Sequence, residues 1–260
     1  MVLQDRSQLA SANRIVVKVG SSSISGENEP QLDLLVDSIA ASMKRGVEVI
    51  LVSSGAIATG MPLLGITTKP EDLATSQALA SVGQSRLIAR YQQSLERYGL
   101  IAGQILLTSG DLDGAETRAN AGLAMNRLVE LGVLPIVNEN DTVATQEIRF
   151  GDNDRLAALV AVLANADALV LLSDIDALYD MPPARAGAKP LDVIAADADL
   201  SLIEVEGTST GVGTGGAITK LGAARVATDA GVCVLLTSAA NVAKALNGEH
   251  VGTWFSASAS

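Results

Sequence analysis

Short runs of apolar, mostly β-branched residues alternate with longer amphipathic segments along almost the whole chain. The strand-like runs lie at 14–19, 47–52, 101–107, 134–137, 168–172 and 232–236. Helical periodicity occupies the intervals at 31–45, 74–98, 117–131, 154–163 and 220–230. This alternation predicts an α/β fold, a three-layer sandwich with a mainly parallel central sheet and helices on both faces.

Polar clusters directly follow four of the strand-like runs, at 20–23, 53–55, 138–141 and 173–174. Ligands of parallel α/β sheets bind outside the carboxyl ends of the strands. A single cluster is explained equally well as a turn, because strand ends need turn residues in any protein. Four clusters at one edge of the same sheet therefore predict a binding site there.

Composition narrows the class of protein. The 260 residues fit a single domain over 1–260, and they carry 18 Lys and Arg against 29 Asp and Glu. This acidic balance argues against nucleic acid or an anionic membrane as a partner, because both need basic surface. The polar residues 1–14 and the lack of a long apolar stretch predict a cytoplasmic protein without a signal peptide or membrane span.

The single cysteine and the single histidine exclude several chemistries. Cys233 lies in an apolar run and is predicted to be a buried thiol, and one cysteine allows no disulfide within the chain. His250 is the one histidine, which excludes a histidine-rich zinc site and a Ser-His-Asp triad elsewhere in the chain.

A glycine-rich segment at 207–222 holds six glycines and closes on Lys220. It is not a dinucleotide fingerprint, because residues 204–210 before it are polar where that motif needs a hydrophobic strand. Glycines let backbone N–H groups approach an anion, and the N-terminus of a following helix adds positive potential. The segment therefore predicts phosphate binding, with a flexible surface loop as the alternative.

Lys18 interrupts the apolar run 15–19, and lysine is rarely buried without a partner. It is either a cation held beside phosphate at a strand end or an edge-strand lysine that reaches solvent. Four acids and three asparagines gather at 138–141 and 150–155. Helix capping explains part of this second group. The remainder could bind a ligand ammonium, hold Mg²⁺ through phosphates, or orient the lysines.

Seven segments resemble motifs of the glutamate 5-kinases, a branch of the amino-acid kinases, and they occur in the order of that family. They are VVKVGSS at 16–22, VSSGAIATG at 52–60, ASVGQSRLI at 80–88, IVNEND at 136–141, FGDND at 150–154, LLSD at 171–174 and GTGGAITK at 213–220.

The resemblance implies the amino-acid kinase fold and the ATP-dependent phosphorylation of the L-glutamate γ-carboxylate to L-glutamyl 5-phosphate, the first step of proline biosynthesis. It also implies ATP and Mg²⁺ as cofactors, feedback inhibition by proline, and a homo-oligomer, either a dimer or a tetramer. Residues of about 14–165 would form the glutamate-binding lobe and about 166–260 the nucleotide-binding lobe. Many members carry a C-terminal PUA domain, and none is expected in this chain.

Residue by residue, the resemblance assigns Lys18 and Lys220 to the transferring phosphoryl group and Asp154 to organising both lysines. Ser54, Asp141 and Asn153 match glutamate-binding positions. The nucleotide-binding positions are Lys18, Ser173, Asp174, Thr214, Gly215, Gly216, Ala217, Ile218, Thr219 and Lys220. No protein metal ligand is implied, because Mg²⁺ arrives with ATP.

The phosphorylation that the resemblance implies is chemically compatible with these residues. A γ-carboxylate has an ordinary pKa near 4.3, so it is an anionic nucleophile at pH 7 and needs no general base. A free α-ammonium needs an anionic or amide partner, which Asp141 and Asn153 provide. N-acetylglutamate lacks that charge, so an N-acetylglutamate kinase is a less favoured alternative. A second alternative is a non-catalytic nucleotide sensor with the same fold. The presence of Lys18, Lys220 and Asp154 together argues against that alternative.

Overall fold

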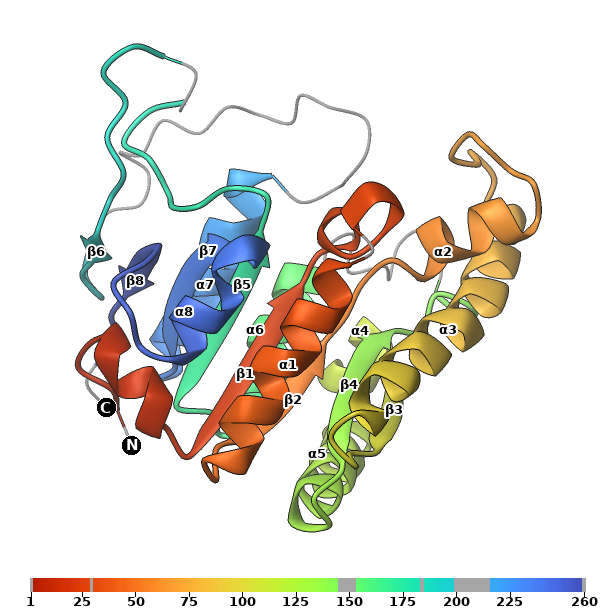
Figure 1. Ribbon diagram of the computed structural model, residues 1–260, viewed down its shortest axis with the longest axis horizontal. Coiled ribbons are helices and arrows are strands. Elements are labelled where there is room, and N and C mark those ends of the chain that lie inside the picture. The colour runs from red at the N-terminus through yellow and green to blue at the C-terminus, as the bar shows by residue number, and fades with distance from the viewer. Residues whose placement is uncertain (1, 29, 145–152, 183–184, 199–215, 259–260) are drawn as a thin grey trace.

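The sheet of this protein has eight strands in the order β3-β4-β2-β1-β5-β7-β8-β6, seen in a computed structural model that describes residues 2–28, 30–144, 153–182, 185–198 and 216–258 (Figure 1). All pairings are parallel except that between β7 and β8. The strands are β1 Arg14–Val19, β2 Glu48–Val52, β3 Ala102–Leu107, β4 Leu134–Glu139, β5 Ala168–Ser173, β6 Val193–Ile194, β7 Cys233–Ser238 and β8 Thr253–Phe255.

Helices cover both faces of the sheet, with α1, α3 and α8 on one side and α5, α6 and α7 on the other (Figure 1). The helices are α1 Gln31–Lys44, α2 Ala56–Leu63, α3 Leu73–Glu96, α4 Ser109–Asp113, α5 Ala115–Glu130, α6 Asn153–Leu163, α7 Ala217–Asp229 and α8 Val242–Leu246. None of the helices in the described part of the chain combines the length and the apolar character that a membrane span needs.

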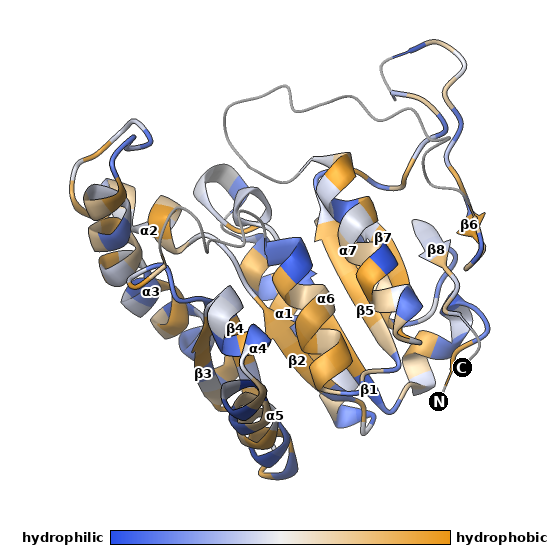
Figure 2. Ribbon diagram, turned by 180° about the vertical axis from the view of Figure 1, so that it is seen from behind, coloured by the Kyte–Doolittle hydropathy of each residue, from blue (hydrophilic) through white to orange (hydrophobic). Residues whose placement is uncertain are grey.

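Two hydrophobic cores form because side chains alternate along each strand. Ile15 and Val17 of β1 pack on the side of α1, whereas Val16 between them packs with α6 and α7 on the other side. Figure 2 shows the central strands coloured as hydrophobic along most of their length, as expected for strands buried on both faces. The predicted three-layer architecture is confirmed.

The six predicted strands and five predicted helices are all present, with ends shifted by a few residues. Five further elements, α2, α4, α8, β6 and β8, were not predicted from the sequence. The helix α2 holds Gly60 and Pro62 within its eight residues, which locally favours a turn. The strands β6 and β8 have two and three residues, too few to show a period of two.

The helix α2 is held by direct backbone contact with α3. A Cβ atom on Gly83 would lie 1.8 Å from the carbonyl oxygen of Ala56, and one on Gly60 would lie 2.1 Å from that of Leu79. Only glycine permits this approach. The contact matters for the site described below, because Ser54 immediately precedes Gly55, the N-cap of α2.

We expect Gly83→Ala to destabilise the protein by about 3 kcal/mol, at the upper end of ordinary overpacking, because a backbone carbonyl cannot move aside as a flexible side chain can. For a chain of this size that lowers the melting temperature by roughly 10 °C. The matched control is Gly222→Ala in α7, where nothing lies within 4 Å of the added Cβ. Helix propensity predicts a small gain there, so equal effects of the two changes would contradict the packing argument.

Candidate active site

The four polar clusters lie at one edge of the sheet. They follow β1, β2, β4 and β5, which are consecutive in the order β4-β2-β1-β5 and run parallel. Their carboxyl ends therefore meet, and the prediction that the clusters share an edge is confirmed. Figure 1 shows this edge together with the first turns of α6 and α7 behind it.

Two lysines that are far apart in the sequence converge on one carboxylate. Lys18 forms an ion pair with Oδ1 of Asp154, and the Nζ atom of Lys220 lies 3.1 Å from Oδ2 of the same residue. Lys18 is 4% exposed, Lys220 is 6% exposed and Asp154 is fully buried at 0%. Asp154 thus holds two buried ammonium groups side by side, which is the local arrangement required to stabilise a polyanion.

The strand geometry explains how Lys18 reaches this position. It shares the face of β1 with Val16 and so points toward α6 and α7, whose first turns hold Asp154 and Lys220. The edge-strand alternative for Lys18 is wrong, because β1 is flanked by β2 and β5 and its Lys18 pairs in register with residues of both.

The start of α7 adds hydrogen-bonding groups to the same place. Gly216 caps the helix in extended conformation, and Ala217 and Ile218 are its first two residues. The hydroxyl of Thr219 donates to the carbonyl of Gly216 at 2.8 Å and lies 3.4 Å from Oδ2 of Asp154. Two predicted nucleotide-binding residues, Thr214 and Gly215, lie outside the described residues.

Ser173 and Asp174 follow β5, next to β1 in the sheet. The hydroxyl of Ser173 donates to Oδ1 of Asp174 at 2.8 Å, and Ser173 is buried whereas Asp174 is exposed. These two residues therefore lie at the predicted edge, although no described contact joins them to the two lysines.

Asn153 organises the other half of the site. Its Nδ2 atom donates to the carbonyl of Ser53 at 2.7 Å, to the hydroxyl of Ser54 at 2.9 Å and to Oδ1 of Asn138 at 2.8 Å. One amide thereby joins the ends of β2 and β4 to the start of α6. Because Asn153 immediately precedes Asp154, it also links this network to the two lysines.

Helix α3 supports the network with two side chains that sequence reasoning did not select. Gln84 accepts a hydrogen bond from Nδ2 of Asn138 at 2.7 Å. The hydroxyl of Tyr91 lies 2.9 Å from that of Ser53, and both residues are buried. Burial raises the pKa of the Tyr91 phenol, which therefore stays protonated and able to donate.

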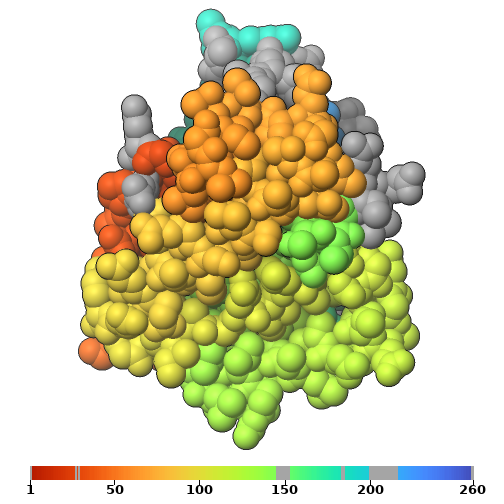
Figure 3. Space-filling view, turned by 90° about the vertical axis from the view of Figure 1, so that its right-hand side faces the viewer, coloured from red at the N-terminus to blue at the C-terminus, as the bar shows by residue number. Residues whose placement is uncertain are grey.

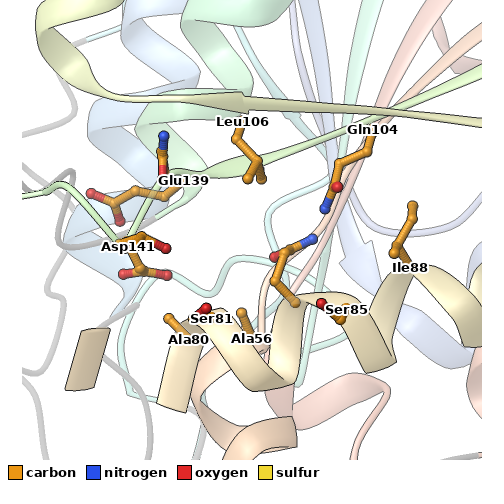
Figure 4. Close-up of a pocket in the computed structure, with 12 residues that line it drawn as sticks. Ala56, Ala80, Ser81, Ser85, Ile88, Gln104, Leu106, Glu139 and Asp141 are labelled. Carbon is orange, nitrogen blue, oxygen red and sulfur yellow. The ribbon is translucent and has the colours of Figure 1, made fainter. Parts of the chain in front are cut away.

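A cavity of about 310 Å³ opens beside this network, between the ends of β3 and β4 and the helices α2 and α3 (Figure 4). Its polar wall includes Glu139 and Asp141, the latter one of the predicted substrate-binding residues. The space-filling view of this flank shows the chain near residue 140, in bright green, at the surface against the atoms of α3 (Figure 3). The cavity lies in the lower part of the size range of small-molecule sites.

Cys233 and His250 take no part in the site. Cys233 begins β7, at the opposite end of that strand from the site, and donates to the carbonyl of Leu3 at 3.2 Å. The predicted burial of this thiol is confirmed, and burial raises its pKa. His250 is exposed and lies 3.2 Å from Asp192.

Comparison with known proteins agrees with the fold. The amino acid kinase family model matches residues 13–238. A glutamate 5-kinase of Clavibacter sepedonicus is 64% identical over 250 residues, covering 96% of both chains, and one of Leifsonia xyli is 59% identical over 256 residues, covering 98% of this chain and 95% of that relative.

Among solved structures, a carbamate kinase from Giardia lamblia bound to AMP-PNP matches with a TM-score of 0.67 and 16% identity, covering 96% of this chain and all of that one. At this identity the likeness concerns the fold alone. The family model and the sequence matches together show that the chain belongs to the amino acid kinase family, within which it groups with the glutamate 5-kinases.

Proposed function

We propose that this protein transfers the γ-phosphoryl group of ATP to the γ-carboxylate of L-glutamate, the first step of proline biosynthesis. The products are L-glutamyl 5-phosphate and ADP. The observation that carries the proposal is the convergence of Lys18 and Lys220 on Asp154 at the ligand-binding edge of the sheet. The relatives named glutamate 5-kinase, at up to 64% identity over nearly the whole chain, support the choice of acceptor.

The main barrier to this reaction is the repulsion between two anions, the acceptor carboxylate and the triphosphate. Phosphoryl transfer is catalysed mainly by positioning and charge stabilisation. At an effective dielectric constant of ~20, one ammonium ~4 Å from a phosphate oxygen contributes about 4 kcal/mol before desolvation. Lys18 and Lys220 supply this charge, and Asp154 fixes where they point. The acceptor is already ionised, so Asp154 is not required as a base.

The nucleotide is proposed to lie against the lobe of about 166–260, near Ser173, Asp174 and the first turn of α7. A carbamate kinase with this fold is known with AMP-PNP bound, which supports nucleotide binding by the fold, and the resemblance to the glutamate 5-kinases supports this position. Mg²⁺ is proposed to arrive on the phosphates, because the described residues contain no group of three or more Asp, Glu, His or Cys suited to hold it. Bound in that way, the ion would neutralise part of the phosphate charge.

The acceptor is proposed to lie against the lobe of about 14–165, where Ser54, Asn153 and Asp141 gather. Asp141 is assigned to the α-ammonium, and we expect Asp141→Asn to raise KM for glutamate by about 10- to 100-fold, the effect of losing a hydrogen bond to a charged group. Turnover at saturating glutamate should fall much less, since Asp141 does not contact the phosphoryl group.

The control acceptor is glutarate, which is glutamate without its ammonium group. Wild type and Asp141→Asn should use glutarate equally poorly in an ADP-release assay. A variant that loses glutarate and glutamate activity to the same extent would show that Asp141 does not recognise the ammonium.

The function itself is tested by glutamate-dependent ADP release, with the acyl phosphate trapped by hydroxylamine. Product from glutamate is expected. Product from N-acetylglutamate alone would favour that acceptor, and no product from either would favour a nucleotide sensor.

We further propose a cytoplasmic homo-oligomer, a dimer or a tetramer, that proline inhibits. The support is the resemblance to the glutamate 5-kinases, together with the chemistry of proline, whose amine and α-carboxylate match the head group of glutamate. Sedimentation and inhibition of ADP release by proline test the two parts separately.

A further inference from the structure

Tyr91 is a buried polar side chain to which the proposed reaction gives no role. It lies on α3 with an exposed fraction of 0% and belongs to the hydrophobic core on the α1 side of the sheet. Its hydroxyl lies 2.9 Å from that of Ser53, which is 1% exposed. Buried polar groups are costly unless they are hydrogen-bonded, so the partners of these two hydroxyls determine where they lie.

The direction of β2 explains why Ser53 and Ser54 face opposite sides of the sheet. Successive side chains of an extended chain alternate, and Val52 packs in the core on the α6 side. Ser53 therefore points the other way, to Tyr91 of α3. Ser54 points back toward α6, where its hydroxyl accepts from Nδ2 of Asn153 at 2.9 Å. Two adjacent serines thus connect α3 with the active-site network.

The direction of the hydrogen bonds follows from the same contacts. The hydroxyl of Ser53 donates to the carbonyl of Ser54 at 3.3 Å. A hydroxyl has one hydrogen, so Tyr91 is the donor in its contact with Ser53. Burial raises the pKa of the Tyr91 phenol, and its proton is therefore present to be donated. A chain of two hydrogen bonds runs from the phenol to the carbonyl of Ser54.

Both peptide groups that flank Ser54 are held in this way. The carbonyl before it, that of Ser53, accepts from Nδ2 of Asn153 at 2.7 Å, and its own carbonyl accepts from the Ser53 hydroxyl. The next residue, Gly55, has a φ of 101°, in the left-handed region that favours glycine. The chain turns here from β2 into α2, so the Ser53 hydroxyl supports the backbone where its direction changes.

We propose that Tyr91 is a positioning residue for the phosphoryl transfer, which acts through Ser53 to hold the backbone of Ser54 and hence the hydroxyl that Ser54 presents to the acceptor. This inference rests on the proposed function, in which Ser54 contacts glutamate. Because Tyr91 is fully buried, it acts only by restricting where Ser54 lies. A displaced contact group binds the acceptor less well, even though every group that touches the substrate is still present.

The test is Tyr91→Phe, which removes the hydroxyl and keeps the ring. We expect KM for glutamate to rise about 3- to 10-fold, the effect of losing one neutral hydrogen bond. KM for ATP should stay within about twofold of wild type, because Lys18 and Lys220 are not part of this hydrogen-bond chain. Both constants are measured by ADP release well below the melting temperature. A merely structural role would lower the melting temperature without separating the two KM values.

Tyr98→Phe is the matched control. Tyr98 follows the end of α3, and its hydroxyl donates to Oδ1 of Asp37 in α1 at 2.8 Å. The control therefore also loses one hydroxyl and one hydrogen bond, but at a contact between two helices instead of at the active-site network. Its kinetic constants should equal those of wild type. Thermal unfolding establishes that both variants are folded.

A double-mutant cycle tests the route through Ser53. Ser53→Ala removes both the acceptor of the Tyr91 hydroxyl and the donor to the Ser54 carbonyl, so it should raise KM for glutamate at least as much as Tyr91→Phe. With Ser53 already replaced, Tyr91→Phe should change this KM by less than about twofold further. Effects of the two changes that multiply would show that Tyr91 acts by another route, and the inference would be overturned.

The remaining outcomes separate the inference from the proposed function. An unchanged KM for glutamate in folded Tyr91→Phe contradicts the inference, as does an equal rise of both KM values. Ser53→Ala must by itself show the same separation of the two KM values, which tests the inference even where Tyr91→Phe does not fold. A wild-type protein that releases no ADP with glutamate contradicts the proposed function before any variant is compared.

Discussion

Replacing Asp154 by Asn is expected to lower the free energy of unfolding by about 3–5 kcal/mol and to remove most of the kinase activity. The stability loss has the size measured when one partner of a buried ion pair is removed, because the remaining charge stays buried without compensation. Here the loss would strand two ammonium groups, those of Lys18 and Lys220, which are both almost fully buried.

The activity loss has a separate cause. Asp154 determines where the two ammonium groups lie, and without it like charges at close range repel each other. Electrostatic catalysis depends on donors that are positioned before the reaction begins. We therefore expect kcat to fall by at least ~100-fold even at temperatures where the variant is folded.

Thermal unfolding should show a melting temperature lower by roughly 10 °C, and ADP release should be measured well below that temperature. Asp113→Asn, at an exposed position at the end of α4, is the matched control and should match wild type in both assays. An Asp154→Asn variant with normal stability would show that the carboxylate does not serve as the shared counter-charge.

The core of this site could be predicted from sequence because its determinants are local. A period of two along β1 is enough to put Lys18 on the face of Val16, and a position in the first turn of α7 is enough to direct Lys220 toward the sheet edge. Asn153 and Asp154 could likewise be placed at a helix start. In each case one element and its direction determine where the side chain points.

The supporting residues could not be found in this way. Gln84 contacts Asn138 across 54 residues, and Tyr91 contacts Ser53 across 38. Both contacts depend on how α3 lies over the sheet, and that placement depends on the close approach of α2 at Gly60 and Gly83. Local patterns do not encode such packing. The one available hint was that Tyr91 is among only three tyrosines in the chain.

Replacing Lys220 by Ala is expected to lower kcat by at least ~100-fold while leaving the fold intact. The two effects separate because Asp154 keeps its ion pair with Lys18, so no buried carboxylate is left without a cation. Only the positive charge at the start of α7 is lost, and in the proposed reaction that charge acts on the phosphoryl group as it moves.

The kinetic signature distinguishes this role from substrate binding. An interaction that strengthens in the transition state changes kcat, whereas one made equally in the bound substrate changes KM. Lys220→Ala should therefore leave KM for glutamate within a few-fold of wild type, and its melting temperature should fall by only a few degrees. Lys244→Ala removes an exposed lysine of α8 and controls for net charge. If Lys220→Ala turned over glutamate at a near-normal rate, the phosphoryl group could not depend on this ammonium, and convergence on Asp154 would be a structural feature alone.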